Sequence, residues 1–242
     1  MAVYGISDLH FSFIEQVDTE RLHLAKVSKP MDIFHSCWQA HYGQIWEHWQ
    51  KSVKKEDTVL LAGDTSWAMR LEETVWDFDF LHQLPGQKVL IRGNHDYWWQ
   101  GVQKINAFLP EDFHILQNNS IVVEGKAVCG TRGWVVPGSK GFGEEDNKIF
   151  QRELLRLEMA LKDGAKTGLP LVAMLHYPPC NEKNEQSLFI ELMADYGVER
   201  CIYGHLHEVR SDKILLEEAW GIRFSLLSCD YLRFAPIFLW EE

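Results

Sequence analysis

The stretch Lys88-Val89-Leu90-Ile91-Arg92-Gly93-Asn94-His95-Asp96 joins a short apolar run to a cluster of polar side chains suited to metal binding and acid–base chemistry. Short runs of this kind are typical of strands that are buried on both faces of a sheet. Gly93 directly precedes the polar residues and permits a tight turn with close backbone approach. We therefore interpret the stretch as a buried strand that delivers Asn94, His95 and Asp96 to a loop at its carboxyl end.

Four other apolar runs end in the same way. The runs at residues 3–7, 58–62, 169–175 and 200–203 lead, in that order, into Asp8-Leu9-His10, Gly63-Asp64, His176 and Gly204-His205-Leu206-His207. In open α/β sheets, ligands gather outside the carboxyl ends of the strands, so we expect the five motifs to meet in space. Side chains two residues apart in an extended chain point the same way, so Asp8 with His10, and His205 with His207, can each present two ligands to one region.

Helical patterns lie between the predicted strands. Apolar side chains recur at intervals of three and four along residues 38–53. Residues 71–84, 144–161 and 187–196 are further predicted helices, the last with Gly197 as its C-cap. Residues 121–128 and the tail at 224–240 are expected to form hairpin or meander strands. This alternation predicts an α/β architecture with mixed sheets.

The candidate ligands are carboxylates, imidazoles and one carboxamide, without a thiolate, which suits Mn, Fe or Zn better than a soft ion. They are too many for one tetrahedral centre, but they suffice for two ions if one carboxylate bridges. The candidate metal ligands are Asp8, His10, Asp64, Asn94, His176, His205 and His207. His95 has no evident metal-binding duty beside Asn94, so it is a candidate proton donor.

Taken in order, the five motifs resemble those of the calcineurin-like metallophosphoesterase superfamily, and the likeness runs from Asp8 to His207. The resemblance implies a four-layer α/β/β/α sandwich with two mixed sheets and both metals at the strand ends. It also implies two ligand sets that share Asp64: Asp8, His10, Asp64 and His207 for one ion, and Asp64, Asn94, His176 and His205 for the other. His95 would protonate the leaving group or steady the phosphate.

We therefore expect a hydrolase that cleaves a phosphomonoester or phosphodiester through a hydroxide activated by two metals, with His95 as general acid and a small phosphorylated substrate. A nuclease acting on nucleic-acid ends is an alternative. A catalytically weak scaffold that binds a protein partner is another, although it would predict lost ligands and none is lost. Arg92 is a candidate for holding phosphate, but an ion pair with a carboxylate is the preferred interpretation. Asp96 either orients the site or caps a following helix.

Two features depart from the best-known pattern of this superfamily. Gly63-Asp64 continues as Thr65-Ser66-Trp67 instead of the Asp-Arg-Gly of the protein Ser/Thr phosphatases, which argues against that activity. The first connection is long, so we predict a single domain over residues 1–242 with a Trp/His-rich insertion around 11–55. The tryptophans at its end, Trp38, Trp46 and Trp49, are expected in the core or in a subunit contact, and a homo-oligomer is possible.

Tyr97-Trp98-Trp99 follows the predicted catalytic motif directly. These rings either line the substrate pocket or pack the next element, and the sequence favours neither interpretation.

Composition limits the partners. The formal net charge is -11, from 35 acidic and 24 basic residues, which disfavours stable binding to nucleic acid or to an anionic membrane. The five cysteines include no CxxC pair, so neither a disulfide framework nor a cysteine zinc site is expected. The first residues lack the features of a signal peptide, and no stretch approaches the length of a membrane span. A cytoplasmic location is expected.

Overall fold

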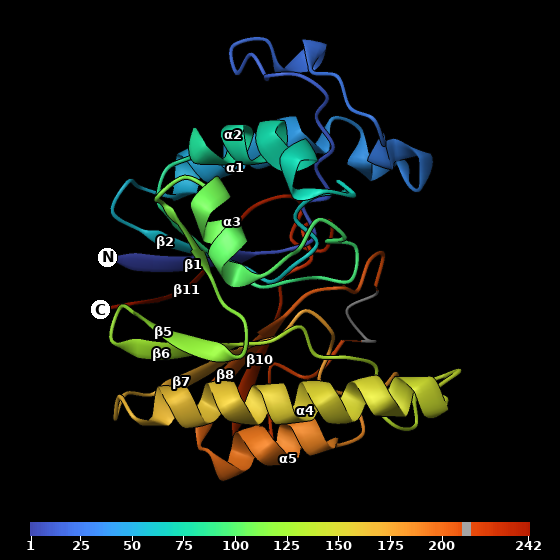
Figure 1. Ribbon diagram of the computed structural model, residues 1–242, viewed down its shortest axis with the longest axis vertical. Helices are drawn as coiled ribbons and strands as arrows, with labels where there is room; N and C mark the ends of the chain where they lie inside the picture. Colours follow the sequence, from blue (N-terminus) through green and yellow to red (C-terminus); the bar gives the residue numbers. More distant parts are fainter. Residues whose placement is uncertain (210–213) are drawn as a thin grey trace.

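The computed structural model describes residues 1–209 and 214–242 as two facing β-sheets with helices on their outer sides (Figure 1). In the first sheet, β1, β2, β3 and β4 run parallel, and β11 pairs with β1 in the antiparallel direction. The strand order of this sheet is β11 (Ile237–Glu241), β1 (Ala2–Ile6), β2 (Thr58–Leu61), β3 (Gln87–Leu90), β4 (Phe113–Ile115).

The second sheet has a parallel centre and two antiparallel edges. Strands β6, β7, β8 and β10 run parallel, while β5 and β9 are antiparallel to their neighbours. The strand order is β5 (Asn119–Val123), β6 (Lys126–Gly130), β7 (Leu171–Met174), β8 (Val198–Tyr203), β10 (Ile222–Leu226), β9 (Glu218–Ala219). Both sheets are therefore mixed, and the predicted four-layer α/β/β/α sandwich is confirmed.

The helices form the two outer layers (Figure 1). The first sheet is covered by α1 (His41–Ser52), α2 (Val75–His82) and α3 (Val102–Phe108), and the second by α4 (Glu144–Ala165) and α5 (Leu188–Asp195). Short 3-10 helices complete the set: η1 (Leu22–Leu24), η2 (Met31–Ile33), η3 (Ser36–Trp38) and η4 (Leu71–Thr74). Among the described residues, no helix has the length and apolar character needed to cross a membrane.

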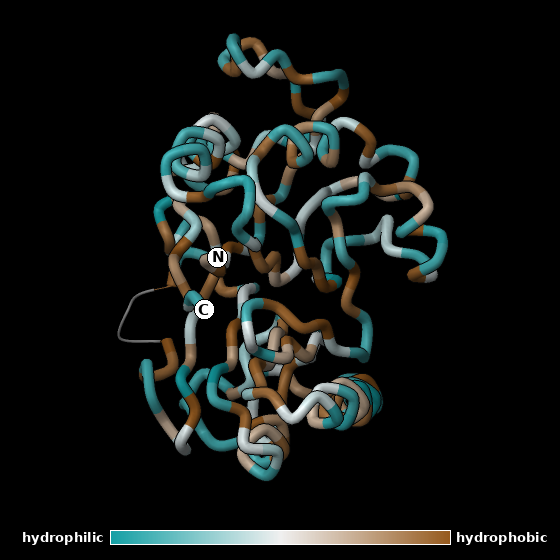
Figure 2. The backbone as a smooth tube through the Cα atoms, turned by 90° about the vertical axis from the view of Figure 1, so that its left-hand side faces the viewer, coloured by the Kyte–Doolittle hydropathy of each residue, from teal (hydrophilic) through white to brown (hydrophobic). Residues whose placement is uncertain are grey.

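Three apolar cores separate the four layers, and they explain the continuous apolar runs. Along β2, Val59 and Leu61 pack in the core beneath the first helical layer, whereas Leu60 lies in the core between the sheets. Successive side chains of a strand point to opposite faces, so a strand with helices on one side and a sheet on the other must be apolar at every position. Figure 2 shows these hydrophobic stretches within the layers.

The first connection, between β1 and α1, extends beyond the outer helical layer in both views (Figures 1 and 2). Its end turns back into the protein, where Trp38 of η3 and Trp49 of α1 are buried in the first core. The helix predicted from the stripe at 38–53 begins at His41, after Trp38. The helix predicted over 71–84 is η4 followed by α2.

Candidate metal centre

All five predicted motifs follow the carboxyl ends of parallel strands, namely β1, β2, β3, β7 and β8. The backbone turns sharply there, because Asp8, His10, Asp64 and His205 all have φ between 49° and 71°. Non-glycine residues rarely adopt this left-handed conformation, and such strain concentrates at functional sites. Gly93 is required here because of close packing: a Cβ at this position would overlap the backbone and side chain of Asp64.

One group of candidate ligands comes from the ends of β1 and β8. The Nε2 atoms of His10 and His207 lie 3.3 Å apart, and His207 Nε2 lies 3.6 Å from Asp8 Oδ1. His10 Nε2 is also 3.8 Å from Asp64 Oδ2. The ligand atoms of Asp8, His10 and His207 all lie within 4.8 Å of one another, which is close enough for one shared ion.

A second group lies beside the first and shares its carboxylates. Asn94 Oδ1 is 2.6 Å from His176 Nε2 and 2.9 Å from His205 Nδ1. His176 Nε2 is 3.5 Å from Asp64 Oδ2, and the ligand atoms of Asp8, Asp64 and His176 lie within 4.8 Å of one another. The structure therefore brings all seven predicted ligands to one place.

Hydrogen bonds at the far side of two imidazoles direct their free nitrogens inward. His176 Nδ1 lies 2.9 Å from the Ala62 carbonyl, and His207 Nδ1 lies 3.1 Å from Asp230 Oδ1. When Nδ1–H donates outward, the lone pair of Nε2 faces the centre, which is the arrangement of metal-binding histidines. Asp230 was not predicted from the sequence. The signal that could have found it is its position four residues after the end of β10.

The donor set fits divalent cations. Asp64 Oδ2 is buried and has no hydrogen-bond donor among the described residues. Around it lie the inward nitrogen of His176 and the oxygen of Asn94, both of which accept hydrogen bonds. Buried acceptors that converge without donors are costly unless a cation lies between them, and nitrogen and oxygen ligands suit Mn, Fe or Zn.

Burial and neighbouring charges favour the neutral forms of most of the candidate ligands when no metal ion is bound. Burial, followed by the nearby imidazoles, lowers the pKa of His205 to about 2, and burial also lowers the pKa of His10 and His176. Burial, with the charges of Asp96 and Asp8, raises the pKa of Asp64 to about 9. The pKa of His207 is raised: burial lowers it, but the hydrogen bond that His207 donates to Asp230 and the negative charge of Asp8 outweigh burial. Neutral imidazoles are the form that binds metal.

Asp96 fixes the geometry of two motif loops. It is fully buried, and its carboxylate accepts hydrogen bonds from the backbone N–H of Gly93, Asp64, Thr65 and Ser66 and from Trp98 Nε1. The interpretation of Asp96 as a helix cap is wrong, because α3 begins only at Val102 with Gly101 as its N-cap. The carboxylate instead holds the loops after β2 and β3 together.

His95 lies next to the candidate ligand Asp64 and against the ring of Trp67. Its backbone N–H donates to Asp64 Oδ1 at 2.7 Å, and its ring centroid is 4.4 Å from that of Trp67. Trp67 also stacks on His10, with ring centroids 4.7 Å apart. Its ring therefore contacts both a candidate metal ligand, His10, and the candidate general acid, His95. Nothing in the sequence pattern indicated this role. Burial, and then the charge of His176, lowers the pKa of His95.

The remaining candidates are placed as follows. Trp98 and Trp99 are buried and pack in the first core, whereas Tyr97 is exposed with its ring 6.1 Å from that of His95. Arg92 forms no ion pair within 4.0 Å among the described residues. The preferred interpretation, an ion pair of Arg92 with a carboxylate, is therefore wrong. Its side chain shares a small cavity of about 70 Å³ with Arg132.

One protein family and several solved structures are similar to this chain. The model of the calcineurin-like phosphoesterase family matches residues 1–209. No curated protein matches the chain significantly. Among solved structures, a protein of unknown function, AQ665, from Aquifex aeolicus is similar, with 18% identity, a TM-score of 0.49, and coverage of 98% of this chain and 95% of that one.

A phosphopantetheinyl hydrolase from Mycobacterium tuberculosis is similar as well, with 14% identity, a TM-score of 0.50, and coverage of 94% of this chain and 88% of that one. At 14% identity this likeness concerns the fold alone. The family match spans most of the chain and includes all five motifs. The chain therefore belongs to the calcineurin-like phosphoesterase family.

Proposed function

We propose that this protein hydrolyses the P–O ester bond of a small phosphorylated substrate with two divalent cations as cofactors. One observation carries the proposal: buried acceptor atoms of carboxylates and imidazoles converge on a point at which Asp64 Oδ2 has no donor among the described residues. Asp8, His10, Asp64 and His207 would hold one cation. The other would be held by Asp64, Asn94, His176 and His205.

Two such cations would neutralise charge on the phosphoryl oxygens and lower the pKa of the attacking water. The protein's own part is to hold the ligands in place. Asp230 orients His207, the Ala62 carbonyl orients His176, and Asp96 fixes the loops that carry Asp64 and Asn94. With this arrangement no covalent phosphoenzyme is needed.

His95 is the proposed general acid. Its side chain lies at the same edge of the sheets and is held against Trp67. A bound phosphoryl group would favour the protonated imidazole, because a nearby negative charge raises the pKa of a histidine. His95 could then donate its proton to the leaving oxygen. Asp96 acts on catalysis through the loops that it positions, and a role of Arg92 in holding phosphate stays a prediction.

The test compares two chromogenic esters. The protein is loaded with Mn²⁺ and assayed with bis-p-nitrophenyl phosphate and with p-nitrophenyl phosphate, next to Asp64→Asn and the matched surface variant Asp195→Asn. We expect hydrolysis of at least one ester, loss of about 100-fold or more in Asp64→Asn, and full activity in Asp195→Asn. The preferred ester separates diesterase from monoesterase activity. No hydrolysis of either ester by protein that holds two Mn²⁺ per chain would refute the proposal and favour the scaffold alternative.

A further inference from the structure

An apolar cavity of about 340 Å³ adjoins the candidate metal centre. It lies among the loops that follow β6, β7 and β8, and Val135, Pro178, Leu206 and Leu215 line it together with the rings of Tyr177 and His205. Its volume is at the lower end of the range of small-molecule pockets, roughly 300–1,000 Å³.

His205 connects this cavity to the centre. Its Nδ1 lies 2.9 Å from Asn94 Oδ1, among the candidate ligands, while the same imidazole forms part of the cavity wall. The ring of Tyr177 packs on it with centroids 4.1 Å apart. A group attached to a phosphoryl in the centre would therefore pass His205 and Tyr177 to enter the cavity.

Asn181 and Glu182, two polar residues at the cavity, already form hydrogen bonds within the protein. Asn181 Nδ2 donates to Glu185 at 2.7 Å, and Asn181 Oδ1 accepts from the backbone N–H groups of Lys183 and Glu185. The carboxylate of Glu182 accepts from the backbone N–H of Lys140. Because Val135, Pro178, Leu206 and Leu215 supply apolar wall, recognition in this cavity depends mainly on apolar contact, and the exposed carboxylate of Glu182 disfavours an anionic occupant.

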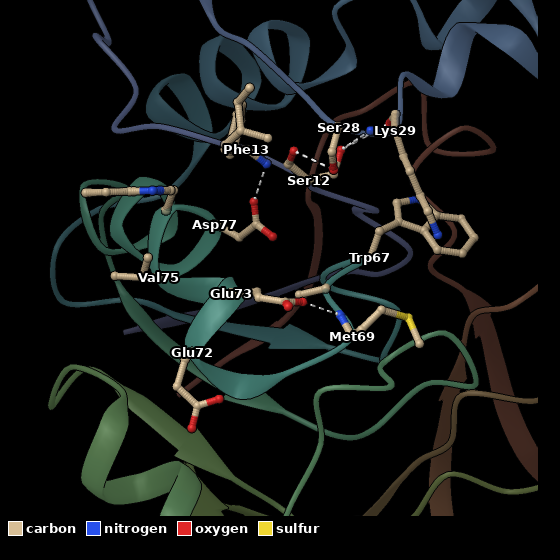
Figure 3. Close-up of a pocket in the computed structure, with 13 residues that line it drawn as sticks. Ser12, Phe13, Ser28, Lys29, Trp67, Met69, Glu72, Glu73, Val75 and Asp77 are labelled. Atoms are coloured by element: carbon tan, nitrogen blue, oxygen red, sulfur yellow. Dashed lines mark hydrogen bonds between the residues drawn. The ribbon is translucent and has the colours of Figure 1, made fainter.

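A larger cavity of about 450 Å³ is a poorer candidate for the same task (Figure 3). Trp67 lines it, but none of the seven candidate ligands does. Its walls carry Glu72, Glu73 and the buried Asp77, whose carboxylate accepts from the Phe13 backbone N–H, as Figure 3 shows. Of these two cavities, the one beside His205 combines an apolar wall with direct contact to the centre.

We infer that the substrate is a phosphoester of an uncharged, apolar alcohol, alkyl or aromatic, whose leaving group occupies the cavity beside His205 and Tyr177. This inference rests on the proposed function for the position of the phosphoryl group. Contacts made equally in ground state and transition state act mainly through KM. Apolar burial then tightens binding about fourfold for each methylene that enters the cavity.

The test measures binding, so it does not depend on turnover. Methyl-, butyl-, hexyl- and octylphosphonate are titrated calorimetrically into the Mn²⁺-loaded protein. Hexylphosphonate is expected to bind at least about 50-fold more tightly than methylphosphonate. Val135→Asp, which places a charge in the cavity wall, and Ser139→Trp, which fills the space, should both flatten this dependence on chain length. Val122→Ser, on the exposed face of β5, should keep it.

Three results would overturn the inference. Equal affinity for all four phosphonates would refute the cavity and leave the proposed function intact, since the phosphonate group still binds. A chain-length dependence that Met69→Asp abolishes, and that Val135→Asp and Ser139→Trp do not, would place the leaving group in the larger cavity. Absence of binding by every phosphonate, together with absence of ester hydrolysis, would refute the inference and the proposed function together.

Discussion

The imidazole of His207 is held between two carboxylates, Asp230 behind it and Asp8 in front of it. The rear hydrogen bond fixes the tautomer that presents Nε2 to a metal, so its loss should weaken the site without removing a ligand. We predict that Asp230→Asn lowers the affinity for Mn²⁺ by about 10- to 100-fold, measured by calorimetric titration of the metal-free protein. Asp195→Asn, an exposed change of the same type, should leave the affinity unchanged, and an equal affinity in both variants would contradict the role given to Asp230.

His95 allows a prediction that separates proton donation from structural support. A general acid matters most when the leaving alkoxide is a strong base, and little when it is p-nitrophenolate. His95→Gln should therefore reduce kcat for an alkyl phosphate by about 10²- to 10⁴-fold and affect a p-nitrophenyl ester much less. The exposed His23→Gln serves as the control. Similar losses for both substrates would show that His95 supports the site without donating a proton.

At the residue scale, sequence reasoning found the groups that follow apolar runs but missed those that support them. The seven candidate ligands converge because each follows a strand that ends at the same edge. Trp67 could not be recognised in this way, and the position of Asp230 after β10 does not reveal its partner, because both roles depend on contacts in space, of His95 with Trp67 and of His207 with Asp230. Such side-chain partnerships are set by tertiary packing and leave no local spacing in the sequence.

At the scale of elements, periodicity predicted the long segments and missed the short ones. The strands that deliver the motifs and the helices α1, α4 and α5 lie where the apolar pattern placed them. α3 spans Val102–Phe108 and buries only Ile105, while β4 spans three residues, so neither contains a full period that could be recognised. η4 takes the place of the first turn of the helix predicted over 71–84, and the sequence did not show this because a single 3-10 turn changes the apolar spacing little.

The buried Asp77 of α2 ties that helix to the first connection. Its Oδ1 accepts from the Phe13 backbone N–H at 2.8 Å, and its Oδ2 accepts from the Ser66 hydroxyl. Burial raises the pKa of Asp77 to about 7, although both hydrogen bonds act in the opposite direction. The folded protein therefore holds a proton at this carboxyl that the unfolded chain releases above a pKa of about 4.

Because the pKa of Asp77 is higher in the folded than in the unfolded protein, the contribution of this residue to the free energy of unfolding decreases as the pH rises. The contribution of Asp77 is complete below the unfolded pKa and is lost as pH rises through the folded value near 7. An asparagine cannot lose a proton there, so Asp77→Asn should gain about 3 kcal/mol relative to the unchanged protein between pH 5 and pH 8. Urea unfolding at both pH values measures the difference, and the exposed Asp195→Asn should show none. A pH-independent difference for Asp77→Asn would mean that the carboxylate is ionised in both states.

At the scale of the whole molecule, the family resemblance of the motifs implied the four layers, but the sequence did not predict the pairing of distant segments. The termini meet through β1 and β11, with Ala2 opposite Glu241, and Trp240 belongs to the core between the sheets. The local apolar pattern along residues 224–240 indicates strands, but it does not show that the last strand joins the first sheet. That choice depends on which sheet edge is free, which is a property of the folded protein.

The candidate ligands come from both sheets, so metal binding should stabilise the molecule as a whole. Asp8, Asp64 and Asn94 follow strands of the first sheet, whereas His176 and His205 follow strands of the second. An ion that binds the folded chain alone stabilises it by about 2.7 kcal/mol at 100 times its Kd. For a chain of this size the gain corresponds to a rise in Tm of roughly 5–10 °C.

Calorimetry of the protein with Mn²⁺ and with a chelator measures this coupling. Asp64→Asn should lose most of the rise, because the proposed bridging carboxylate contributes to both ligand sets, while Asp195→Asn should keep it. Mg²⁺ should give a smaller rise at equal concentration, since this site is rich in imidazole and Mg²⁺ prefers oxygen ligands. An identical Tm with Mn²⁺ and with chelator, or an undiminished rise in Asp64→Asn, would show that the converging side chains do not act as one metal centre joining the two sheets.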